Sequence, residues 1–149
     1  MASKPPTLVA IDHDDYHAKH VGHTPDGRQF FLTLPFEPAF NGRPGCEYVA
    51  LYLFDREGRL IEAKIDRVGP RGKPNDEIQK NLRAQRLQEL GDVSFTRIEV
   101  EPFSVERFDI HFGLIAQEPD HRIAYWLVDV EPGGYMTFFE PWNSGDYDT

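Results

Sequence analysis

The chain has 149 residues, of which 40% are hydrophobic and 28% are charged. This is the length of one domain and an ordinary globular composition, which excludes a disordered, collagen-like or coiled-coil chain. No apolar run approaches the roughly 18 residues of a membrane-spanning helix. The first residues, MASKPPTLVAIDHDD, lack a secretory signal, and the single cysteine, Cys46, cannot form an intrachain disulfide. We therefore expect a cytoplasmic protein.

The net charge of −9 is unevenly distributed along the chain. Residues 1–74 carry ten basic and ten acidic residues, whereas residues 75–149 carry six basic and fifteen acidic ones. From residue 118 onward, seven acids accompany one base, Arg122. Such a potential repels nucleic-acid phosphates and anionic lipid, and it attracts basic proteins. The charge therefore predicts a basic protein partner and neither nucleic acid nor membrane; a solvated, solubility-promoting surface is the alternative.

The first half of the chain is predicted to consist of strands. Residues 1–7 are expected to be a flexible leader, and residues 8–149 a single domain. Short apolar runs separated by turn residues indicate strands at about residues 8–12, 16–23, 29–34, 47–54 and 60–66. The run at 47–54 is apolar on both faces, which is typical of a strand in the middle of a sheet.

One helix is predicted, from Asn75 to Leu90. Asn75 is expected to cap it through its side-chain oxygen, and Asp76 and Glu77 suit the first turn. Gly91 is expected to end the helix with a positive φ. One broad arc, which is expected to cover a face of a sheet, holds Ile78, Leu82, Leu87 and Leu90.

Further strands are predicted after the helix, at about residues 94–101, 107–116, 122–130 and 135–139. In the second of these, one face is expected to hold Phe108, Ile110, Phe112 and Leu114. Connections this short favour antiparallel neighbours, because parallel strands need long crossovers. The predicted fold class is α+β: a curved, mainly antiparallel sheet of about seven to nine strands with one long helix, about residues 75–90, packed on it.

Histidines cluster near the amino terminus, and they raise the possibility of a metal site. On a helix, His13, His17 and His20 would share one face, and histidines at i and i+4 can bind one divalent metal. The segment contains Gly22 and runs into Pro25, which favours a strand instead. On a strand these imidazoles do not converge, so a polar edge strand is the simpler interpretation.

The carboxyl-terminal stretch PGGYMTFFEPWNSGDYDT mixes aromatic residues with acids. Aromatic anchors beside a charged rim are typical of protein-binding patches. The predicted interface takes Tyr135, Trp142 and Tyr147 as anchors and, as steering charges, Glu131, Glu140, Asp146 and Asp148. The alternative is that these rings belong to the core.

Together these features predict a non-enzymatic interaction module that binds a basic protein partner, immunity-like or regulatory in kind. Small acidic proteins that neutralise basic toxin domains share these gross properties, although no motif in the chain is specific to them. No nucleotide-binding, hydrolase or zinc motif is present, and no cofactor is predicted. Two alternatives remain: a metal-dependent enzyme or metal binder using the histidine cluster, and a small-molecule binder in the concave face of the sheet.

Overall fold

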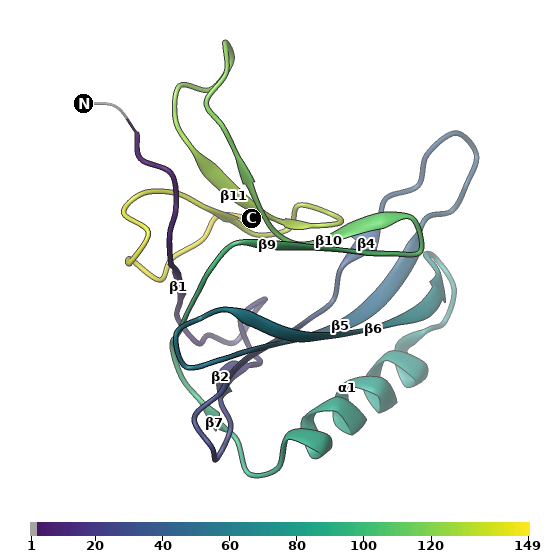
Figure 1. Ribbon diagram of the computed structural model, residues 1–149. Helices are drawn as coiled ribbons and strands as arrows, with labels where there is room; N and C mark the ends of the chain where they lie inside the picture. The colour runs from purple at the N-terminus through teal and green to yellow at the C-terminus, as the bar shows by residue number, and fades with distance from the viewer. Residues whose placement is uncertain (1–2) are drawn as a thin grey trace.

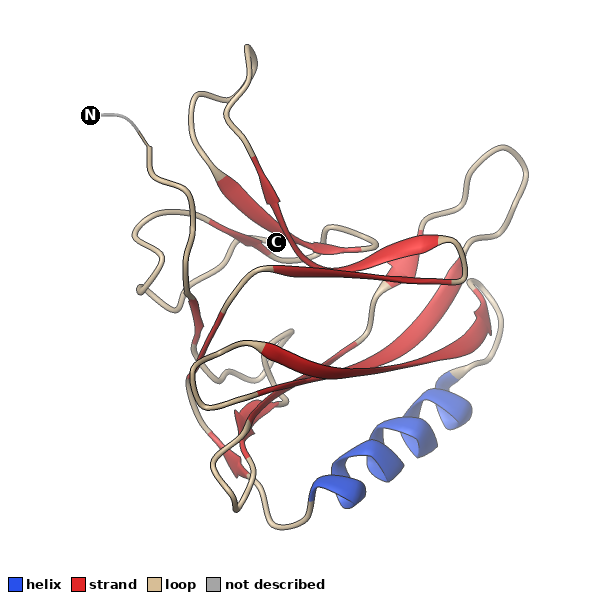
Figure 2. Ribbon diagram, viewed as in Figure 1, coloured by secondary structure: helices blue, strands red, loops and turns tan. Residues whose placement is uncertain are grey.

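The computed structural model of the protein describes residues 3–149, which form twelve strands and one helix (Figures 1 and 2). In chain order the elements are β1 (Val9–Ile11), β2 (Val21–His23), β3 (Gln29–Thr33), β4 (Phe36–Glu37), β5 (Cys46–Phe54), β6 (Leu60–Pro70), α1 (Asp76–Leu90), β7 (Ser94–Phe95), β8 (Ile98–Val100), β9 (Phe103–Arg107), β10 (Ile110–Gln117), β11 (Leu127–Glu131) and β12 (Thr137–Phe138).

Strand β5 lies at the centre of the largest sheet, as its two apolar faces predict. It pairs with β6 on one side and with β3 and β4 on the other, and β3 leads through β2 to β7. Every pairing is antiparallel. Eight of the nine β5 residues are buried, because both faces of the sheet are covered.

A second sheet, of strands β9 to β12, covers one face of the first. Between the two sheets lies the main core, in which Phe112, Leu114, Val128, Val130 and Phe138 join Phe31, Tyr48, Ala50, Tyr52 and Phe54. Helix α1 covers the opposite face, so the molecule has three layers (Figure 2). Side chains therefore cover both faces of the large sheet, including the concave one where a small-molecule site was the alternative prediction.

The α+β class with antiparallel sheets and one helix is confirmed, but the single curved sheet of about seven to nine strands is wrong, because twelve shorter strands form three sheets. The predicted strand 94–101 is two strands: β7 pairs with β2, whereas β8 pairs with β1 in a small sheet of their own. The predicted strand 107–116 begins in a turn. Phe108 and Asp109 have positive φ there, so Phe108 is exposed instead of extending the apolar face.

The helix occupies the predicted residues, but two details differ. Leu82, Leu87 and Leu90 pack on the sheet, whereas Ile78 is 49% exposed, because at 3.6 residues per turn it lies about 110° from the centre of the three leucines. Asn75 makes no side-chain cap. Its amide instead donates to the carbonyl of Pro70 at 2.7 Å. Gly91 ends the helix with a positive φ, as predicted.

Two long loops project from the molecule on the side away from the helix (Figure 1). We call residues 38–45 the β4–β5 arm and residues 118–126 the β10–β11 arm. The predicted strand 122–130 is therefore too long, since β11 begins at Leu127. Among the described residues, no helix combines the length and apolar character that crossing a membrane requires.

Candidate functional site

The two ends of the described chain lie side by side and build one region together. The carboxyl-terminal segment turns back after β12, and Asp148 exchanges two backbone hydrogen bonds of 2.8 Å with Thr137. On its way it accepts the N–H of Ala10 at the carbonyl of Trp142, at 2.8 Å. The segment is therefore fixed in place by β1 and β12, and any site on it has a defined shape.

The polar atoms of the three predicted aromatic anchors are all engaged in hydrogen bonds within the protein. The Tyr135 hydroxyl lies 2.6 Å from the Thr33 hydroxyl, and the Tyr147 hydroxyl donates to the carboxylate of Asp14. The Trp142 indole N–H donates to a backbone carbonyl at 3.2 Å. All three rings are partly buried against the main core. They support this end of the molecule, while the exposed ring nearby belongs to Tyr125, which is 48% exposed.

The four predicted steering carboxylates divide among three hollows. Glu140 and Asp148 line the first. Asp146 lines a second, beside the amino-terminal loop. Glu131 lines a third, at the foot of the β4–β5 arm. The structure therefore brings together only Glu140 and Asp148 of this set.

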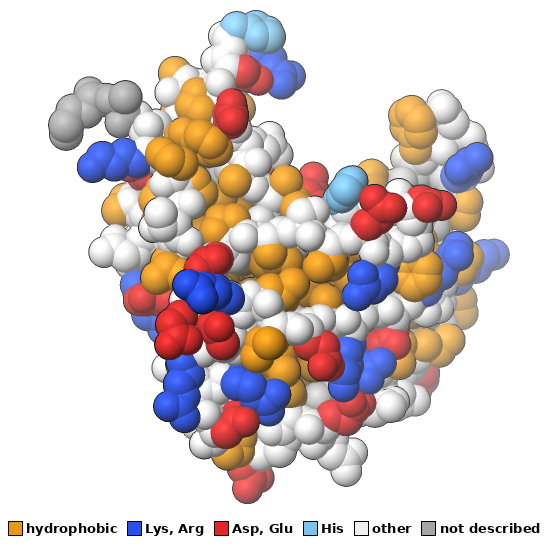
Figure 3. Space-filling model, in the orientation of Figure 1, with side chains coloured by type: hydrophobic (Ala, Val, Ile, Leu, Met, Phe, Trp, Pro, Cys, Tyr) orange, Lys and Arg blue, Asp and Glu red, His pale blue; other side chains and the backbone are white. Residues whose placement is uncertain are grey.

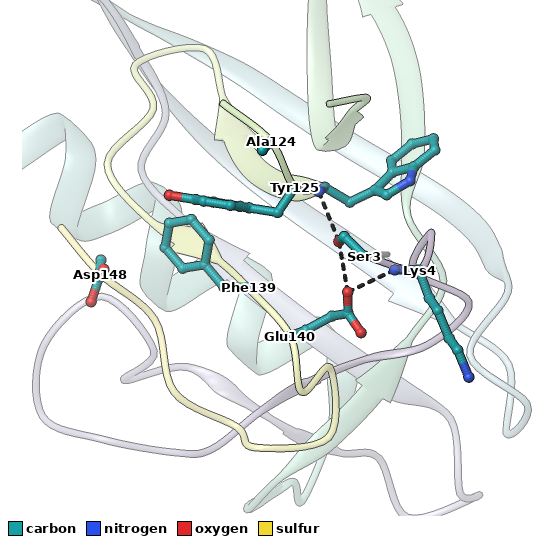
Figure 4. Close-up of a pocket in the computed structure, with 8 residues that line it drawn as sticks. Ser3, Lys4, Ala124, Tyr125, Phe139, Glu140 and Asp148 are labelled. Atoms are coloured by element: carbon teal, nitrogen blue, oxygen red, sulfur yellow. Dashed lines mark hydrogen bonds between the residues drawn. The ribbon is translucent and has the colours of Figure 1, made fainter. Parts of the chain in front are cut away.

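The first hollow, which we call the carboxyl-terminal cavity, has a volume of about 830 Å³ (Figure 4). It is lined by Ser3, Lys4, Ala124, Tyr125, Trp126, Phe139, Glu140 and Asp148. The rings of Tyr125 and Phe139 pack edge to face, with 5.7 Å between their centroids. Glu140 and Asp148 lie on either side of the Phe139 ring, so the cavity has an apolar wall between two carboxylates (Figure 4).

Ser3 joins three parts of the chain at this cavity. Its hydroxyl donates to Glu140 at 2.6 Å and accepts the N–H of Trp126 at 3.0 Å. The backbone N–H of Lys4 donates to the same Glu140 oxygen at 2.7 Å. The Ser3 hydroxyl and the Lys4 N–H lower the pKa of Glu140, because both bonds favour its charged form. Glu140 is thus a fixed negative charge at neutral pH.

Sequence reasoning missed six of the lining residues, which are Ser3, Lys4, Ala124, Tyr125, Trp126 and Phe139. The first two lie in the predicted leader. Residues 124–126 fall in the predicted strand 122–130, although they belong to the β10–β11 arm. One signal was present, because adjacent residues of a strand point to opposite faces. Phe138 is buried, so the Phe139 that follows β12 was a candidate for exposure.

The histidine segment forms a loop, so the predicted strand 16–23 shortens to β2. His13 and His20 both pack on the ring of Phe95, with centroids 5.7 and 5.8 Å away. His17 packs instead on Tyr16 and Tyr135, at 3.9 and 5.3 Å. Within residues 3–149, no group of three or more His, Cys, Asp or Glu side chains is arranged to hold a metal ion. The three imidazoles are therefore ring-packing groups in this loop.

Hydrogen bonds to Asp14 fix the charge states in the same loop. Partial burial opposes its ionisation, but the Tyr147 hydroxyl and two backbone N–H groups donate to it and lower its pKa overall. Burial above all, and then the bond to Asp14, raise the pKa of Tyr147 to about 12. Burial lowers the pKa of His17, although the charge of Asp14 opposes this. At neutral pH a tyrosine hydroxyl thus donates to a charged carboxylate.

The chemistry of the carboxyl-terminal cavity suits a ligand group that is both apolar and cationic. Aromatic rings attract cations at their faces, and ionised carboxylates strengthen that attraction.

Comparisons of the chain with models of protein families, with curated proteins and with solved structures each found no significant match.

Proposed function

We propose that the protein is a non-enzymatic interaction module, which binds a basic protein partner at the carboxyl-terminal cavity. The observation that carries the proposal is the aromatic wall of this cavity, formed by the exposed Tyr125 and the half-buried Phe139, with Glu140 and Asp148 on either side. Protein interfaces combine buried aromatic anchors with a polar rim, and the cavity offers both in one place.

The apolar surface continues beyond the cavity. Ile123 and Tyr125 on the β10–β11 arm are 38% and 48% exposed. Figure 3 shows hydrophobic side chains gathered at the base of this arm. A projecting apolar loop next to a cavity gives a partner both a pocket to fill and a wall to pack against, and contiguous exposed apolar surface is typical of interaction sites.

The net charge of the cavity lining selects the sign of the partner, because the carboxylates of Glu140 and Asp148 outnumber the one ammonium group, that of Lys4. Glu140 is held ionised by its hydrogen bonds, and Asp148 is exposed. The chain carries a net charge of −9, so the general field also attracts a basic protein. The partner we propose therefore presents an arginine or lysine side chain to the cavity.

Fluorescence anisotropy with defined peptides tests the proposal. The probe is a fluorescein-labelled arginine–alanine repeat peptide, and a glutamate–alanine repeat is its charge control. We expect the arginine peptide to bind and the glutamate peptide not to bind. Binding of the arginine peptide should weaken as the salt concentration rises from about 50 to about 300 mM. The double substitution Glu140→Gln with Asp148→Asn should weaken it about tenfold, and Tyr125→Ala by a similar factor.

Two matched controls distinguish recognition at the cavity from nonspecific effects of net charge and of exposed apolar surface. Glu77→Gln with Asp92→Asn removes the same charge from exposed positions at the two ends of helix α1, on the other side of the molecule. Ile61→Ala removes another exposed apolar side chain, 55% exposed on β6. Equal losses in the cavity variants and in these controls would refute recognition at the cavity.

A further inference from the structure

The two arms enclose a hollowed surface on the outer face of the second sheet (Figures 1 and 3). Along β11, Val128 and Val130 point into the core. Asp129 and Glu131 alternate with them and therefore point outward, with Thr137 of β12 beside Asp129. We call this surface the saddle, and we define it by the outward side chains Gln117, Asp129, Glu131 and Thr137. Its two sides are the β10–β11 arm, which bears Tyr125, and the β4–β5 arm, which bears Phe40.

The floor of the saddle holds two carboxylates that lack a counter-charge. Asp129 accepts hydrogen bonds from the amide of Gln117 at 2.5 Å and the hydroxyl of Thr137 at 2.6 Å, both of which are neutral groups. Among residues 3–149, neither Asp129 nor Glu131 has an ion-pair partner. Burial, and then the charge of Asp129, raise the pKa of Glu131. A cation placed between the two would relieve this repulsion.

A separate hollow of about 580 Å³ lies where the saddle meets the β4–β5 arm. Its lining includes Glu37, Asp129 and Glu131 together with the ring of Phe40. Phe40 is 72% exposed, the highest value among the large apolar side chains that the structure describes. An exposed ring beside carboxylates provides the two contacts that a guanidinium makes, which are stacking on a ring and forked hydrogen bonding to oxygens.

We infer that the saddle binds an arginine-bearing segment of the basic partner, which reaches from the carboxyl-terminal cavity to the hollow at Phe40, Asp129 and Glu131. The inference rests on the proposed function and adds a second, separate contact point. Arginine fits better than lysine because its planar group can stack on Phe40 while it donates to two oxygens. A neighbouring hollow shares Glu37 and Phe40 but is also lined by two arginines, Arg43 and Arg67. They would repel the segment there, so the charge directs it to the side of Phe40 that holds Asp129 and Glu131.

Substitutions at the carboxylates and at the ring of the saddle should each weaken binding of the peptide by a defined factor. The substitution Asp129→Asn with Glu131→Gln keeps the shape of both side chains and should weaken binding of the arginine–alanine peptide about tenfold. Phe40→Ala alters a side chain that makes few internal contacts and should weaken binding about threefold. The control substitution Glu77→Gln with Asp92→Asn removes the same amount of charge far from the saddle. It should change the affinity for the peptide by less than about twofold.

Amide chemical-shift mapping with the same peptide locates the contacts. We expect shifts at two sets of residues: 124–126 and 139–140 around the cavity, and 37–40 and 129–134 around the saddle hollow. Side-chain carboxyl resonances should also show the pKa of Glu131 falling when the peptide binds. A lysine–alanine repeat should produce the same pattern with weaker affinity.

The outcomes separate the inference from the proposed function. Shifts at both sets, lost at the saddle in the Asp129→Asn, Glu131→Gln variant, support the saddle. Shifts confined to the cavity overturn the saddle but leave recognition at the cavity intact. Binding without shifts at either set overturns both. The unbound spectrum of each variant shows whether it is folded, and Phe40→Ala gives an independent result if the carboxylate variant is not.

Discussion

The hydroxyl of Tyr147 offers the sharpest test of how the amino- and carboxyl-terminal parts are held together. It donates to Asp14 and accepts the backbone N–H of His17, which are 133 and 130 residues away. Tyr147→Phe removes both bonds and keeps the ring. A hydrogen bond to a charged group is worth about 1.5–3 kcal/mol. The side chains of Tyr147 and Asp14 are both partly exposed, so water replaces part of the hydrogen-bond stabilisation when the hydroxyl is removed. We therefore expect a loss of about 1 kcal/mol in the free energy of unfolding.

The loss should depend on pH in a defined direction. The pKa of Asp14 is lowered in the folded state, so its contribution to stability is complete above the unfolded value of about 3.9 and disappears as the pH falls through the folded value. The difference between Tyr147→Phe and the native protein should therefore be constant from about pH 5 to 8 and shrink below about pH 4.

Urea unfolding followed by tryptophan fluorescence, at neutral and at acidic pH, measures both effects. In a separate thermal melt, the same loss of about 1 kcal/mol corresponds to a fall of about 2–4 °C in the melting temperature of a chain this size. Tyr16→Phe is the matched control, because Tyr16 is 65% exposed and its hydroxyl makes no hydrogen bond with residues 3–149. Equal losses in both variants, or a Tyr147→Phe loss that does not change with pH, would refute the reasoning.

Two further predictions concern the fold itself and use the same unfolding assay. Phe112→Ala empties a fully buried position between the sheets and should cost about 3–5 kcal/mol, whereas Phe40→Ala on the exposed arm should stay within about 0.5 kcal/mol; similar losses would contradict the assigned core. Gly113→Ala should cost about 2 kcal/mol or more, because its new Cβ would lie 2.2 Å from a backbone oxygen of β9 at positive φ. Gly42→Ala, also at positive φ but in open space, should cost clearly less, and an equal cost would rule out the steric argument.

Local patterns in the sequence were enough to identify the elements that carry the core. The two apolar faces of residues 47–54 predicted a central strand, observed as Cys46–Phe54, because a strand must be covered wherever it is apolar. The residues around Asp76–Leu90 predicted the helix and its end at Gly91 because helix propensity and the glycine's positive φ are local properties. The same patterns could not show that 94–101 splits between two sheets, since alternation carries no information about which strand is the partner.

The candidate site depends on contacts that no local pattern contains. Ser3 meets Glu140 across 137 positions, and Tyr147 meets Asp14 across 133, because backbone hydrogen bonds hold the carboxyl-terminal segment against β1 and β12 in the folded structure. The amino-acid order did place aromatic rings and acids together near the end of the chain. Only the stacked layers decide that Tyr135 and Tyr147 pack against the core while Tyr125 and Phe139 line the cavity, because burial of a ring is set by the layer that covers it.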